Sequence, residues 1–313
     1  MPLNIVFMGT PEFAATCLKG ILNKGYTFCG VFSQPDRPKG RGQKVTPTPV
    51  KELAEQCSIP VFQPDSLRDG KALEALTIMK PDLIVVVAYG RLLPKEILEL
   101  PPLGCINLHA SLLPKLRGAA PIQWSVMNGD TVTGVTSMYM AEGMDTGDMI
   151  LSRATPIAPA ETAGELSQRL ALLGGELLAE TIPLIIGGKA PRIPQDEHSV
   201  TFAPRILKED AAVDFRKAPK DVVNQIRGMN PSPLAYAQLN GERVLLHAAQ
   251  VADVMGFPPP PGVIGDAKRL IVGCGNGAIQ LLRVQPQGKK VMDAAAFANG
   301  RRLQGGERFD MPE

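Results

Sequence analysis

The chain has 313 residues, of which 44% are hydrophobic and 20% charged, and its formal net charge is +2 at pH 7. This is the composition of a globular protein with a full core, and the length exceeds that of one average domain, so we expect two domains. The near-balance of charges excludes a globally basic surface, so any nucleic-acid contact must come from a local basic patch.

The cysteines indicate a reducing compartment. No two of the five cysteines have the Cys-x-x-Cys spacing of a zinc or redox site. The five are Cys17, Cys29, Cys57, Cys105 and Cys274. No apolar run reaches membrane-spanning length without a Gly or Pro, and no basic leader precedes Leu3–Met8. We therefore expect a cytoplasmic protein without a membrane segment.

The first elements alternate between strands and helices. Ile5–Met8 is a short apolar run that stops at Gly9-Thr10-Pro11, and a helical pattern follows over Phe13–Leu22. Asp82–Ala88 is continuously apolar, as expected of a strand covered on both faces by helices. The other predicted strands are Phe28–Phe32, Cys105–His109 and Gly134–Met140. The alternation predicts a mostly parallel, doubly wound α/β sheet.

One long helix is predicted over Glu161–Gly187. Thr162 and Glu165 fit a capping box at its start, and Gly187-Gly188 ends it. Leucines recur along one face of this helix: Leu166, Leu170, Leu173 and Leu177.

After this helix the composition and the hydrophobic periodicity of the chain change. Lys189–Pro204 contains three prolines and little periodicity, which suits a linker. One helix is predicted near Pro219–Gly228, and short β runs separated by turns make up the rest. The runs are Ala235–Leu239, Arg243–Val251, Leu270–Val272 and Ala278–Val284. We expect a small β-barrel. The predicted division is a first domain over 1–189, a linker over 190–208 and a second domain over 209–313.

Three polar residues stand at or beside predicted strand ends. Asn107 and His109 are two apart on one strand and therefore point to the same face. Ligands of open α/β sheets bind at the carboxyl ends of the strands. Asp145 follows in the glycine-flanked loop Gly143–Gly147 after the next strand. The three side chains are expected to meet.

Such a trio suits acyl transfer to an amine. Attack of an amine on a formyl carbon builds a tetrahedral oxyanion, to which the Asn107 amide and a protonated His109 can donate hydrogen bonds. Asp145 can fix the imidazole tautomer or take a proton from the amine. Asn-x-His also recurs by chance, and a structural role for both residues is an equal alternative. His198 and His247 lack metal-ligand spacing to His109, so no metal is expected.

The run from Asn107 to Ile122 closely resembles the signature of the 10-formyltetrahydrofolate-dependent formyltransferases. The form of its end, Arg117-Gly118-Ala119-Ala120-Pro121-Ile122-Gln123, favours the branch that acts on methionyl initiator tRNA over the branch that acts on glycinamide ribonucleotide. Other segments also match: Phe7–Ala14, Gln34–Gly42, Val86–Gly90, Met144–Asp148 and Gln285–Lys290. Leu116 departs from the family, where an aromatic residue is usual, as does the less aromatic Met229–Pro233 element.

The resemblance implies a Rossmann-like folate-binding and catalytic domain followed by an OB-like barrel that binds tRNA. It implies transfer of a formyl group from 10-formyltetrahydrofolate to the α-amine of methionyl initiator tRNA, for translation initiation. Asn107, His109 and Asp145 carry over as the catalytic trio. A folate-binding segment also carries over, although its apolar residues are alternatively core: Ser111, Leu112, Leu113 and Pro114. We expect a monomer.

A basic segment covers Ser33–Lys51. It holds five basic residues and one acid, so its local charge is 5 − 1 = +4. Its prolines and glycines predict an exposed loop without a regular element. On composition alone a solvated loop without function is as good an interpretation, but the resemblance implies contact with the tRNA acceptor stem. The expected phosphate contacts are Arg41 first, then Arg37, Lys39 and Lys44, with Arg205 and Lys208 from the linker.

Other functions stay open at this point. A formyltransferase acting on a sugar nucleotide or on glycinamide ribonucleotide would have neither the basic loop nor this barrel. A nicotinamide dehydrogenase needs a Gly-x-Gly-x-x-Gly turn, which Gly9–Ala14 lacks. A non-catalytic RNA-binding protein is disfavoured by the intact Asn/His/Asp set.

Overall fold

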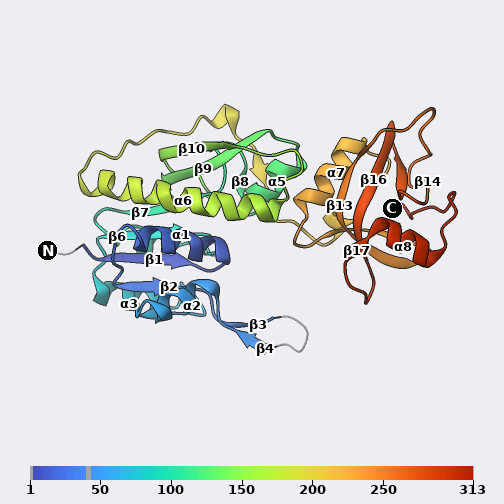
Figure 1. The fold of residues 1–313 in the computed structure, drawn as a ribbon. Coiled ribbons are helices and arrows are strands. Elements are labelled where there is room, and N and C mark those ends of the chain that lie inside the picture. Colours follow the sequence, from blue (N-terminus) through green and yellow to red (C-terminus); the bar gives the residue numbers. More distant parts are fainter. Residues whose placement is uncertain (1–2, 40–43, 313) are drawn as a thin grey trace. The chain divides into compact units, whose positions relative to one another are not determined.

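Figure 1 shows the fold of the chain in a computed structural model. The structure describes residues 3–39 and 44–312. The chain forms two compact units that each draw on more than one stretch of sequence. Unit 1 comprises residues 1–119, 133–155 and 167–203, and unit 2 comprises residues 120–132, 156–166 and 204–313.

Unit 1 is built on a seven-stranded sheet in the order β10-β9-β7-β6-β1-β2-β5. The strands β1, β2, β5, β6 and β7 pair in parallel, and β9 joins β7 antiparallel. Their bounds are β1 Ile5–Gly9, β2 Gly30–Phe32, β5 Val61–Phe62, β6 Leu83–Val87, β7 Cys105–His109, β9 Val132–Tyr139 and β10 Met149–Pro156. Every residue of β1 and β6 is buried, as expected for strands covered on both faces.

The helices of unit 1 begin and end where local signals place them. Thr48 caps α2 by accepting a hydrogen bond from the Lys51 backbone amide. Thr162 and Glu165 form the predicted capping box of α6, in which each side chain accepts from the other's backbone amide. The helices are α1 Glu12–Leu22, α2 Pro49–Gln56, α3 Lys71–Met79, α4 Lys95–Leu98 and α6 Ala163–Ile186, of which the first turn of α6 is counted in unit 2.

Two short pairings complete unit 1. β3 (Arg37–Lys39) pairs antiparallel with β4 (Lys44–Thr46). β8 (Arg117–Gly118) pairs in parallel with β11 (Phe202–Ala203), and the 3-10 helix η1 (Glu197–Ser199) lies just before β11.

Unit 2 is an antiparallel sheet in the order β12-β13-β16-β15-β14, with β17 added to β16. Inward residues such as Val244, Leu246 and Val284 form its core together with Ile226 and Phe297 from two helices. The strands are β12 Ala235–Leu239, β13 Glu242–Ala252, β14 Ile264–Asp266, β15 Ile271–Cys274, β16 Gly277–Pro286 and β17 Met292–Asp293. The helices are α5 Pro121–Met127, η2 Glu209–Ala211, α7 Pro219–Gly228 and α8 Ala294–Arg301.

The predicted fold class is confirmed: a mostly parallel α/β sheet is followed by a small antiparallel, barrel-like domain. The expectation that the basic segment lacks any regular element was wrong. Its two arms pair as β3 and β4, because Arg37, Pro38 and Lys39 lie opposite Thr46, Val45 and Lys44 in an extended hairpin. Among the described residues, no helix combines the length and the apolar character that a membrane crossing requires.

Candidate functional site

The carboxyl end of β7 carries Asn107 and His109. Their strand lies between β6 and β9, so both neighbours fix its register: Asn107 lies opposite Val86 on one side and Met138 on the other. The Asn107 side chain is half-buried, and its amide has no hydrogen-bond partner within residues 3–39 and 44–312. A half-buried amide without a partner in the protein can bind water or a ligand.

The imidazole of His109 is buried and held at one nitrogen. Its Nε2 lies 2.9 Å from the carbonyl oxygen of Leu116. A carbonyl oxygen only accepts, so Nε2 carries a hydrogen and donates it. In the neutral ring, Nδ1 is therefore the unprotonated nitrogen, and Nδ1 lies 3.6 Å from Asp145 Oδ2. Nδ1 is thus the atom of His109 that can exchange a proton.

Asp145 is the third member, and its loop is tightly constrained. Its Oδ2 accepts a hydrogen bond of 2.9 Å from the Gly118 amide. Asp145 has φ +54°, the left-handed region that few non-glycine residues adopt. Two residues on, a Cβ on Gly147 would lie 1.8 Å from the Tyr139 carbonyl oxygen, so only glycine fits there. Gly147 therefore lets the Asp145 loop pack closely against the end of β9.

The structure thus brings His109 and Asp145 together, with Asn107 on the same strand as His109. The site offers an amide donor without a partner among the described residues, an imidazole bonded at Nε2, and a carboxylate facing its Nδ1. This set can stabilise negative charge on an oxygen and can accept or donate a proton.

The segment predicted to bind folate is a compact turn directly after β7. The Ser111 hydroxyl donates to the Lys115 carbonyl oxygen at 2.6 Å, and the Thr136 hydroxyl donates to the Ser111 carbonyl oxygen at 2.7 Å. Ser111 and Leu113 are buried, whereas Leu112 and Pro114 are half-buried. The Ser111 hydroxyl hydrogen closes the turn, and Leu112 and Pro114 are the members with surface left to offer.

The predicted tRNA contacts fall in three places. Arg37 is exposed on β3, and Lys39 and Lys44 belong to the β3–β4 hairpin. Arg41 lies outside the described residues. Arg205 and Lys208 are exposed in unit 2.

Two further charged residues of the basic segment, Asp36 and Lys51, form an ion pair with each other. The Lys51 ammonium lies 2.7 Å from the Asp36 carboxylate. Hydrogen bonds from Gln63 and Lys51 lower the pKa of Asp36 from its ordinary value. Since this pair is neutral as a unit, the charge of +4 resides on the four residues between them in sequence, Arg37, Lys39, Arg41 and Lys44.

Residues 192–203 contain contacts to the site that were not predicted from the sequence. The return segment, residues 192–203, belongs to unit 1 although its composition suits a linker. Gln195 donates from its side-chain amide to the carbonyl oxygens of Asp145 (2.7 Å) and Gly147 (2.9 Å). The Thr201 hydroxyl accepts from the Leu116 amide at 2.9 Å. Neither residue could be predicted from a periodic pattern or a motif, because each one bonds to a residue that is distant in the sequence.

Arg117 links the return segment to the site. Its guanidinium is buried and donates to Gln195 Oε1 at 3.0 Å and to both carboxylate oxygens of Glu197 at 2.8 and 3.3 Å. The hydrogen bonds from Arg117 lower the pKa of Glu197 from its ordinary value. A buried guanidinium with a bidentate partner is a fixed element. Arg117 therefore anchors the strand whose next amide, that of Gly118, holds Asp145.

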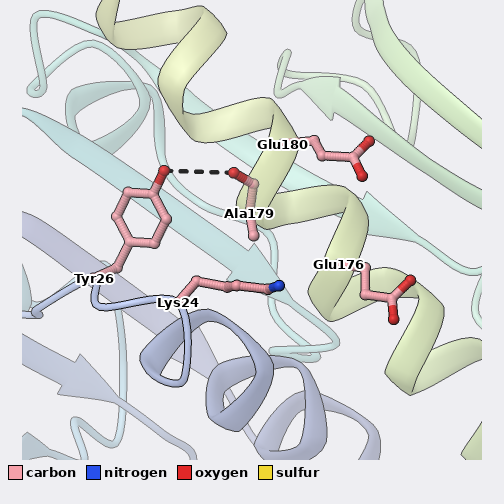
Figure 2. A pocket seen from close by; sticks show the side chains of 5 residues that line it. All are labelled: Lys24, Tyr26, Glu176, Ala179 and Glu180. Carbon is pink, nitrogen blue, oxygen red and sulfur yellow. Dashed lines mark hydrogen bonds between the residues drawn. The ribbon is translucent and has the colours of Figure 1, made fainter.

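A separate surface pocket of unit 1, of about 340 Å³, involves none of the predicted site residues (Figure 2). Its walls come from the loop after α1, with Lys24 and Tyr26, and from α6, with Glu176, Ala179 and Glu180. The Tyr26 hydroxyl donates to the Ala179 carbonyl oxygen at 3.4 Å. Arg153 forms ion pairs with both glutamates, so its single charge offsets part of the negative charge on this wall.

Comparisons with known proteins identify the family of this chain. A family model described as formyl transferase matches residues 3–182, and one described as the formyl transferase C-terminal domain matches residues 205–302. The chain is 46% identical to methionyl-tRNA formyltransferase from Geobacter sulfurreducens, over 98% of this chain and 96% of the relative. It is 48% identical to methionyl-tRNA formyltransferase from Symbiobacterium thermophilum, over 99% of this chain and 96% of the relative.

A solved structure shares the fold. The N-formyltransferase from Helicobacter canadensis, in complex with folinic acid and dTDP-3-aminofucose, aligns with a TM-score of 0.69 at 19% identity. The alignment covers 91% of this chain and 99% of that chain. At this identity the likeness concerns the fold alone.

Proposed function

Because this chain belongs to the formyl transferase family, we propose that it is a methionyl-tRNA formyltransferase. It would transfer a formyl group from 10-formyltetrahydrofolate to the α-amine of methionyl initiator tRNA. One observation carries the choice of acceptor: the relatives that match nearly the whole chain at 46% and 48% identity bear this name. The sugar-associated structural neighbour, at 19% identity, supports no acceptor.

The reaction forms a C–N bond to the acceptor amine and breaks the C–N bond of the donor. One proton must leave the amine, and one must reach the departing nitrogen. In our proposal, the unpaired amide of Asn107 donates to the formyl oxygen as negative charge develops on it. His109 Nδ1 receives the amine proton, because Nε2 is committed to the Leu116 carbonyl.

Asp145 completes the catalytic set. Its carboxylate lies 3.6 Å from His109 Nδ1, so protonation of that nitrogen creates an ion pair inside a largely buried site. The Gly118 amide keeps this carboxylate oriented at 2.9 Å. The imidazolium formed after the amine attacks is thereby stabilised and stays ready to return its proton to the departing nitrogen.

The donor is proposed to lie along Leu112 and Pro114, with Ser111 and Leu113 holding the turn from below. Two observations support this fit: these two apolar side chains are half-buried, and they follow directly on the strand that carries the unpaired Asn107 amide. When bound, 10-formyltetrahydrofolate supplies the activated formyl group. We propose no metal for this chemistry.

The tRNA backbone is proposed to bind the basic hairpin, with Arg41 as the first contact and Arg37, Lys39 and Lys44 beside it. Arg205 and Lys208 would add phosphate contacts from unit 2. The formal charge of +4 on Arg37, Lys39, Arg41 and Lys44 supports this role, since phosphate neutralisation dominates affinity for nucleic acids. The five free cysteines suit the reducing cytoplasm in which we place a monomeric enzyme.

The test is a panel of acceptors at one donor concentration. We expect formyl transfer to methionyl initiator tRNA at a kcat/KM at least about 10²-fold above that for methionyl elongator tRNA, in the range that substrate discrimination reaches. Glycinamide ribonucleotide and a dTDP-linked amino sugar should give no transfer. Transfer to either small amine in preference to tRNA would refute the proposed acceptor while leaving the family chemistry intact.

A further inference from the structure

The loop that carries Asp145 is fixed by a hydrogen-bonding residue that is distant in the sequence. Asp145 has φ +54°, a conformation that most L-residues leave unless neighbouring bonds fix it. The loop connects β9 to β10, where the Tyr139 amide donates to the Asp148 carbonyl oxygen at 2.9 Å. That bond fixes the base of the loop. The carbonyl groups at its tip, those of Asp145 and Gly147, need another partner.

The side-chain amide of Gln195 is that partner, and both its nitrogen and its oxygen form hydrogen bonds. Its two amide hydrogens go to the carbonyl oxygens of Asp145 and Gly147, at 2.7 and 2.9 Å. Its oxygen accepts from Arg117 Nε at 3.0 Å. No acidic or shorter side chain reproduces this pattern: Glu has no hydrogens to donate, and Asn is one methylene too short.

The return segment that presents Gln195 is itself fixed on both sides. Ile193 and Met149 exchange backbone hydrogen bonds of 2.9 and 3.0 Å. Further along, the Thr201 carbonyl accepts from the Arg117 amide at 2.9 Å. Gln195 is therefore delivered to the loop by a segment with two anchors in unit 1.

We propose that Gln195 is a positioning residue of this site: it holds the left-handed backbone of Asp145, so that the carboxylate faces His109 and the Gly118 amide. The inference rests on the proposed function in one respect only, that Asp145 takes part in formyl transfer. Gln195 itself touches no reacting atom. Its effect must pass through Asp145.

Three variants test the proposal. Gln195→Glu keeps the size and the acceptor for Arg117 but removes both donors, and Gln195→Met removes the polar group at similar volume. Asp196→Asn is the matched control, because the neighbouring exposed carboxylate accepts from the His198 amide and the Ser199 hydroxyl within its own turn and contacts neither Asp145 nor Gly147. Melting temperatures identify any variant that fails to fold, and the kinetic test then uses the other Gln195 variant.

Transfer is measured in single turnovers with enzyme in excess, so that slow variants remain measurable. We expect Gln195→Glu to lower the rate about 10²-fold, the cost of a misplaced catalytic group, with half-saturating substrate concentrations changed less than about threefold. In an Asp145→Asn background the same change should cost less than about threefold more, because residues that act through one another are not additive. Equal losses in both backgrounds, or the same loss in Asp196→Asn, would overturn the proposal.

Hydrogen exchange of the Gly118 amide provides a readout that needs no activity. In the folded protein this amide donates to Asp145 Oδ2 at 2.9 Å. If Gln195 positions Asp145, Gln195→Glu should speed exchange at Gly118 by about tenfold, while Asp196→Asn leaves it unchanged. Should the wild-type chain transfer no formyl group, this measurement still decides the positioning role. Unchanged exchange in both Gln195 variants would contradict it.

Discussion

At the residue scale, Asn107 and His109 differ in what the protein itself requires of them. The His109 imidazole is bonded to the Leu116 carbonyl, whereas the Asn107 amide has no partner among the described residues. Loss of His109 should therefore cost both stability and activity. Loss of the Asn107 amide should cost activity alone.

We expect His109→Ala to lower kcat by about 10²–10⁴-fold, the usual contribution of a general acid–base group. The same change leaves the buried Leu116 carbonyl unpaired and should lower the free energy of unfolding by about 1–3 kcal/mol. Steady-state kinetics and urea unfolding measure the two effects. His247→Ala is the control, since the His247 ring bonds to the Gln285 side chain on the surface of unit 2. A His109→Ala enzyme with wild-type kcat would remove this residue from the mechanism.

Asn107→Leu is nearly isosteric and removes the donor. We expect kcat to fall by about 10²–10³-fold, as for loss of one oxyanion donor. The free energy of unfolding should stay within about 0.5 kcal/mol or rise, because no hydrogen bond within the described protein is broken. A large loss of stability at unchanged kcat would indicate that Asn107 is structural.

The sequence could predict part of this site. Alternation along a strand places Asn107 and His109 on one face, and two glycines mark the turn that carries Asp145. It could not predict which imidazole nitrogen is free, since that depends on the Leu116 carbonyl seven residues away. Nor could it identify Gln195, which reaches Asp145 across 50 residues of sequence from a stretch without periodicity.

At the scale of elements, apolar strands and capped helices were predictable, and short pairings were not. β6 and α6 follow from local signals: five buried apolar residues in one and a capping box in the other. The basic hairpin and β11 did not follow, because strands of two or three residues depend on the partner strand for their stability.

For the basic hairpin, we expect Arg41→Ala and Arg37→Ala each to raise KM for methionyl initiator tRNA by about fivefold or more. The dependence of log(1/KM) on log salt should become shallower by roughly one per lost phosphate contact. KM for the folate donor should not change. Lys71→Ala, an exposed lysine at the start of α3, serves as the charge-matched control. Equal, small effects on both substrates would contradict a tRNA-binding role for the hairpin.

At the scale of the whole molecule, each compact unit is assembled from separate stretches of chain. In unit 2, Arg227 on α7 connects three of them: its guanidinium donates to the carbonyl oxygens of Val126 and Glu161 and to Asn224 Oδ1. Burial lowers the pKa of Arg227 from its ordinary value, against an opposing effect of Glu161. The composition of these stretches contains no sign of this connection, so domain boundaries could be predicted only coarsely.

We expect Arg227→Met to lower the free energy of unfolding by about 2–4 kcal/mol, since a buried side chain loses its hydrogen bonds to Val126, Glu161 and Asn224. Urea unfolding monitored by circular dichroism checks this. Arg243→Met is the control, because the Arg243 guanidinium lies over the Tyr236 ring on the exposed face of β13 and should cost less than about 1 kcal/mol. Equal losses in the two variants would show that Arg227 connects nothing essential.

The central claim is that Asp145, held beside His109, carries the transfer of the formyl group to methionyl initiator tRNA. Asp145→Asn tests it most directly, because an asparagine oxygen can keep the Gly118 bond while the charge facing His109 Nδ1 is lost. In single turnovers we predict a rate at least about 10²-fold below wild type, with unchanged donor affinity and melting temperature. A variant that formylates initiator tRNA at the wild-type rate would contradict the account.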